Sequence, residues 1–129
     1  MHWNAGGWFG GQIGATIWIL VAGILTSVRD LATGMIVVLF FVTANVVGLA
    51  LWVSRKLSCY ASTQVLIGIS GICSLSTVYV LDRANVWEQI QTGGQISAFS
   101  TYWIIGLVFG GLMIMFYFRF GRGPSGPRA

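Results

Sequence analysis

The chain has 129 residues, of which 56% are hydrophobic and 8% are charged, with seven basic and three acidic side chains. This charged fraction is about a third of that of soluble domains, and it is too small to cover the surface of a soluble protein of this size. The composition therefore excludes an ordinary soluble enzyme and a disordered chain. With only two cysteines it also excludes a disulfide-rich secreted domain, so an integral membrane protein is what remains.

Four uncharged, apolar runs are long enough to cross a bilayer, which takes about 20 residues in a helix. They cover residues 10–28, 35–53, 61–81 and 99–118, and no acidic or basic side chain lies inside any of them. The runs do not alternate as barrel strands do, and four strands are too few to close a barrel. The sequence therefore predicts an all-α fold, a four-span transmembrane helical bundle of antiparallel hairpins, in one membrane domain over residues 1–119.

The basic residues predict the orientation of the spans, because Lys and Arg accumulate in cytoplasmic loops. With four spans, the N-terminus, the loop after the second span and the C-terminus share one side. That side holds five of the seven basic residues, namely Arg55, Lys56, Arg119, Arg122 and Arg128. We therefore expect both termini in the cytoplasm and the protein in a bacterial inner (plasma) membrane. The basic residues then set the orientation of the spans and interact with anionic lipid headgroups of the bilayer, and no nucleic-acid partner is expected.

The longest connection, between the third and fourth spans, has helical periodicity. Val86, Trp87 and Ile90 fall on one face, which predicts a short amphipathic helix over residues 84–92 in the outer interface. An irregular loop anchored by Trp87 is an equally good interpretation. Trp87 and Glu88 mark this loop as the segment best placed to meet a partner on the outer side.

The last ten residues, 120–129, contain three glycines, two prolines and two arginines, with little that can pack. This composition is typical of a flexible tail, which the predicted topology places in the cytoplasm.

Asn45 is the most polar residue at membrane depth, near the middle of the second span. Its amide either lines a pore or forms an interhelical hydrogen bond, and the second interpretation is favoured because membrane helices use such bonds to associate. Gln12 and Gln64 lie near the starts of the first and third spans. We expect both to be hydrated or to cap a helix.

The third span is unusually small and polar for its depth. It contains Gly68, Ser70, Gly71, Ser74 and Thr77, and of these Gly68, Gly71 and Ser74 are three apart and share a broad face. Such a face either packs closely on another helix or lines a narrow polar path. Close packing is favoured, because small residues let membrane helices approach.

The fourth span carries Gly106 and Gly110, a pair four residues apart. This spacing predicts a close helix contact, either within the bundle or between copies of it.

No catalytic set is visible in the sequence. There is one His, and the cysteines at positions 59 and 73 do not form a C-x-x-C pair. We expect no enzyme activity, no metal site and no cofactor.

Two functions follow. The first is a structural or accessory membrane protein that acts by helix association, as a homo-oligomer or with a membrane complex partner. The alternative is a small oligomeric channel or passive carrier for an ion or small polar solute. No titratable residue lies inside a span, so the path would have to use uncharged polar groups. Asn45 and the polar face of the third span would line it.

Overall fold

Four long helices make up the computed structural model, which describes residues 3–87 and 96–121. The helices are α1 (Ala5–Arg29), α2 (Leu31–Ser54), α3 (Cys59–Arg83) and α4 (Ala98–Phe116), and a π-helical turn, η1 (Tyr117–Gly121), continues the last. Each of the four is long and apolar enough to cross a membrane. The prediction of an all-helical chain with four apolar spans is confirmed.

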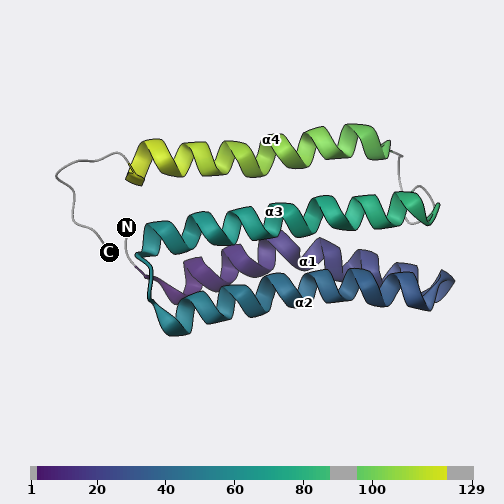
Figure 1. Cartoon of the computed structure of the whole chain (residues 1–129), viewed down its shortest axis with the longest axis horizontal. Helices are drawn as coiled ribbons and strands as arrows, with labels where there is room; N and C mark the ends of the chain where they lie inside the picture. Colours follow the sequence, from purple (N-terminus) through teal and green to yellow (C-terminus); the bar gives the residue numbers. More distant parts are fainter. Residues whose placement is uncertain (1–2, 88–95, 122–129) are drawn as a thin grey trace.

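The helices lie side by side and alternate in direction (Figure 1). α1 begins, α2 ends, α3 begins and α4 ends at one end of the molecule, which we call the N-terminal end. α1, α2 and α3 contact one another pairwise, whereas α4 packs mainly along α3 and is the least buried of the four. The arrangement is therefore a three-helix core with a fourth helix on its side. Lipid permits this, because an apolar helix surface facing hydrocarbon needs no protein cover.

A single residue, Asp30, joins α1 to α2. Its backbone N–H donates to Thr26 O at 2.7 Å and ends α1, while its carboxylate accepts from the Thr33 hydroxyl at 2.6 Å and the Thr33 backbone N–H at 3.4 Å. The Thr33 hydroxyl holds the pKa of this exposed carboxyl below its ordinary value. Because Asp30 caps α2, this helix begins four residues before the predicted start of the second span.

Side-chain caps begin the other helices as well. The Asn4 side chain accepts from the Gly7 backbone N–H at 2.9 Å, so α1 begins five residues before the predicted start of the first span. Ser58 and Ser97 cap α3 and α4 through hydrogen bonds of 3.1 Å.

The connection after α3 begins with a turn. Asn85 has a left-handed backbone with φ of 60°, and residues 84–87 are not helical. The remainder of the predicted interfacial helix, including Glu88, lies outside the described residues. Trp87 is buried, and its indole N–H donates to Ile96 O at 2.8 Å. This bond joins the two described ends of the connection. Residues 122–129 of the predicted tail also lie outside the described residues.

α1 and α2 approach most closely at two glycines near their turn. A Cβ placed on Gly34 would lie 2.5 Å from the Ser27 backbone nitrogen, and one placed on Gly23 would lie 3.2 Å from the Gly34 carbonyl oxygen. The distance at Gly34 is shorter than any Cβ can make without a shift of the backbone, and the distance at Gly23 is tighter than most Cβ contacts. The hairpin is therefore held together by backbone-to-backbone contact.

Candidate functional site

The side chain of Asn45 lies at the contact between α1 and α2. Its Nδ2 donates to Thr16 Oγ1 at 3.0 Å and to Phe41 O at 2.8 Å, and its Oδ1 accepts from Gln12 Nε2 at 2.9 Å. The Thr16 hydroxyl in turn donates to Gln12 O at 2.8 Å. We call Gln12, Thr16 and Asn45 the amide network. It ties the two helices together at membrane depth, where no water can replace a lost partner.

Gln12 is 4% exposed, so the expectation of a hydrated side chain is corrected. The reason is that α1 begins earlier than predicted, which places Gln12 two turns inside the helix. Gly48 on α2 makes the space, because a Cβ there would lie 2.5 Å from Gln12 Cδ. The Gly48 carbonyl also accepts from the Trp8 indole N–H at 3.2 Å.

Gln64 on α3 makes an interhelical hydrogen bond to α4, as Gln12 and Asn45 do between α1 and α2. Its Nε2 donates to Met113 O on α4 and to the Tyr60 hydroxyl, both at 2.9 Å. It joins α3 to α4, which replaces the hydrated or capping role expected from the sequence.

The partners of Asn45 on α1 were not predicted, because the sequence of one span does not show which residues of another span lie beside it. The short turn at Asp30 does contain a signal for which residues of the first two spans lie side by side. Thr16 and Asn45 lie 14 and 15 residues from Asp30 on either side, so an antiparallel hairpin brings them level.

The polar residues predicted on α3 face the interior. Ser70, Ser74 and Thr77 are fully buried. The Thr77 hydroxyl donates to Cys73 O at 2.8 Å, four residues back. The hydroxyls of Ser70 and Ser74 have no hydrogen-bond partner in the part of the chain that the structure describes, so the structure does not bond them to Asn45.

The four glycines predicted to pack differ in their surroundings. A Cβ placed on Gly71 would lie 3.1 Å from Phe109 Cβ, so this glycine is at the contact of α3 with α4. Gly68, Gly106 and Gly110 would bring a Cβ within 4 Å of nothing in residues 3–87 and 96–121. The contact predicted for Gly106 and Gly110 is therefore not made within this part of the chain, and a contact between copies stays a prediction.

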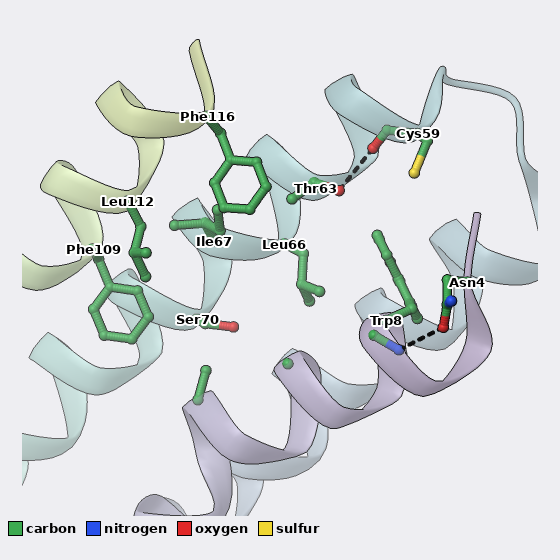
Figure 2. Close-up of a pocket in the computed structure, with 13 residues that line it drawn as sticks. Asn4, Trp8, Cys59, Thr63, Leu66, Ile67, Ser70, Phe109, Leu112 and Phe116 are labelled. Carbon is green, nitrogen blue, oxygen red and sulfur yellow. Dashed lines mark hydrogen bonds between the residues drawn. The ribbon is translucent and has the colours of Figure 1, made fainter. Parts of the chain in front are cut away.

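A cavity of about 340 Å³ lies between α1, α3 and α4 toward the N-terminal end (Figure 2). Most of its wall is apolar, and the large side chains that α3 and α4 contribute to it are Leu66, Ile67, Phe109, Leu112 and Phe116. Ser70 lines its deeper part, and Asn4 and Cys59 line the part nearest the helix ends.

Other chemistry is sparse in the described residues. Both cysteines are free and buried. No group of three or more His, Cys, Asp or Glu that could hold a metal ion occurs among residues 3–87 and 96–121. Comparisons with protein families, with curated proteins and with solved structures found no match.

Proposed function

We propose that the protein is a structural or accessory membrane protein, and that α4 is the surface through which it associates with further copies or with a larger membrane complex. The observation that carries the proposal is the surroundings of Gly106 and Gly110. α4 is the least buried helix, and a Cβ placed on either glycine would meet nothing within 4 Å in the described chain outside its own stretch of helix.

Glycine has a cost in a helix that faces only lipid. It lowers helix stability by about 1 kcal/mol relative to Ala, and it offers lipid no side chain. A pair spaced by four residues does offer a second helix a close approach. Exposed aromatic and aliphatic side chains flank the pair and would give such a helix contact area; Phe99 is 73% exposed and Leu107 70%.

The proposed orientation places both termini in the cytoplasm of a bacterial inner membrane. It is supported by the basic residues Arg55, Lys56 and Arg119, which belong to the N-terminal end. The Arg55 guanidinium carbon lies 4.5 Å from the ring centre of Trp52 and 5.0 Å from that of Trp3. Cations and Trp rings together are typical of a membrane interface.

The mass of the protein in mild detergent tests the association. One chain has a mass of 14.0 kDa. We expect native mass determination to find a defined complex larger than this, and we expect Gly106→Leu and Gly110→Leu to release the single chain. Gly111→Leu is the matched control, because Gly111 has equally open surroundings on another part of the helix surface. A lone chain in the wild type would contradict the proposal.

A passive channel or carrier for a small polar solute is the second candidate function. The observation that favours it is the pair of buried hydroxyls at Ser70 and Ser74 without a partner in the described residues. Such hydroxyls can form hydrogen bonds with a polar solute in place of those that it made with water. Uptake of glycerol into reconstituted vesicles should then exceed that of empty vesicles and fall in Ser74→Ala. Equal uptake by both kinds of vesicle would count against this function.

A further inference from the structure

The cavity between α1, α3 and α4 contains a hydrogen-bond donor that the protein does not use. Ser70 is fully buried, and its Oγ has no partner in the described chain. Thr16, Thr63 and Thr77 each donate at 2.8 Å to the carbonyl four residues back, whereas the hydroxyls of Thr26, Ser62 and Ser74 also lack a partner in the described chain. Ser70 is the one of these unpartnered hydroxyl residues that lines the cavity. Figure 2 shows the Ser70 hydroxyl among the side chains that face the cavity, between Leu66 and Phe109.

The cavity has the size and the lining of a site for a small ligand. Its volume of about 340 Å³ is within the range of small-molecule sites, which are mostly apolar with a few placed polar groups. None of the residues that line it carries a charge at neutral pH. A ligand would therefore be neutral, because a charge buried there would have no counter-charge.

The depth of Ser70 in the membrane limits which kinds of ligand can reach its hydroxyl with a hydrogen-bond acceptor. Ser70 lies eleven residues beyond Cys59, where α3 begins. At 1.5 Å per residue this is about 16 Å, or roughly half of a hydrocarbon layer of about 30 Å. The ester groups of a bilayer phospholipid stay near the interface, and its acyl chains carry no acceptor. A phospholipid therefore leaves the Ser70 hydroxyl unsatisfied.

We propose that this cavity binds a neutral, lipid-soluble compound that carries one uncharged oxygen acceptor, such as a ketone or quinone carbonyl. Its apolar body packs against Trp8, Phe109 and Phe116, and its oxygen accepts a hydrogen bond from the Ser70 hydroxyl. The site is independent of the association proposed for α4.

Two probes that differ by one oxygen test the proposal on the full chain in mild detergent. Benzophenone has a carbonyl and diphenylmethane lacks it. We expect both to shift the methyl NMR signals of Leu66, Ile67 and Leu112, which line the cavity. After correction for partition into the micelle, benzophenone should bind about 3- to 10-fold more tightly, the range expected of one neutral hydrogen bond. Ser70→Ala should remove this preference.

Filling the cavity from α1 gives an independent variant. Gly11 lines the cavity, and a Cβ placed there meets nothing within 4 Å in the described chain, so Gly11→Leu should fold and abolish binding of both probes. Gly14→Leu is the matched control, because Gly14 is equally open and does not line the cavity; it should bind as the wild type does.

Three kinds of result would overturn the proposal. The first kind concerns the probes themselves: no probe-dependent shifts at the three lining residues, or a preference for benzophenone that survives Ser70→Ala. The second is a copurified phospholipid in contact with these methyl groups that benzophenone does not displace. The third is binding that appears only after removal of residues 122–129, which would make the chain's own end the occupant.

Discussion

The amide of Asn45 shows how polar residues are accommodated at membrane depth. Both of its polar atoms are bonded to protein, and two of its partners, Gln12 and Thr16, lie on the neighbouring helix. A membrane interior has no water to take over from a missing partner, so the members of the amide network depend on one another.

Removing a second member should therefore cost less than removing the first. We expect Asn45→Leu to lower the free energy of unfolding by about 1–2 kcal/mol, because the buried Gln12 amide loses its side-chain acceptor and keeps only the backbone carbonyl of residue 45, at 3.1 Å, while Thr16 Oγ1 loses its donor. The double variant Gln12→Leu with Asn45→Leu should lose less than the sum of the single variants. Denaturation in mixed micelles, followed by Trp fluorescence, measures each value.

Thr43→Val is the control for this cycle, because Thr43 is exposed on the same helix and should be neutral. Strict additivity of the two single variants would show that the amide network is not a unit.

The sequence predicted that Asn45 matters, but not with which residues. A single polar residue in an apolar span is visible without any structure. The burial of Gln12 was not predictable from the span boundaries, because a cap at Asn4 extends α1 by five residues and moves Gln12 from the expected interface into the helix contact.

At the scale of the elements, the α1–α2 hairpin is the closest helix pair. The turn is one residue long, and Gly34 stands against the backbone of Ser27. Neither helix can move sideways to make room near so short a turn.

A single methyl group at this point should therefore be costly. We expect Gly34→Ala to lower the free energy of unfolding by about 1–3 kcal/mol, the usual range for overpacking, because its Cβ would lie 2.5 Å from the Ser27 nitrogen. Gly14→Ala is the matched control on α1; its Cβ meets nothing within 4 Å in the described chain, and the better helix propensity of Ala should make it neutral or stabilising. Equal stability of the two variants would contradict the close approach at Gly34.

The contact between Gly23 and Gly34 was not predicted, although the helices were. Spacing within one helix selects pairs such as Gly106 and Gly110. The contact at Gly23 and Gly34 instead joins two helices across a turn. Spans that are apolar all round have no polar face to show which side meets a neighbour, so composition predicts the helices and not their contacts.

At the scale of the whole molecule, the scarcity of charge predicted the number and the type of the helices. It did not predict their arrangement as a core of three with α4 on the side of α3. In water an apolar helix must be covered by protein, whereas hydrocarbon covers it equally well, so the sequence contains no signal for closure of the bundle.

Association of α4 with another membrane protein chain is tested most directly by photo-crosslinking in intact cells. Benzoylphenylalanine would replace Trp103 or Leu107, which are 63% and 70% exposed on α4. Val46 on α2, 59% exposed, is the control position. We predict a discrete protein product from Trp103 and Leu107 and none from Val46. Association through α4 is contradicted if the α4 positions give no discrete protein product, or if Val46 gives the same product.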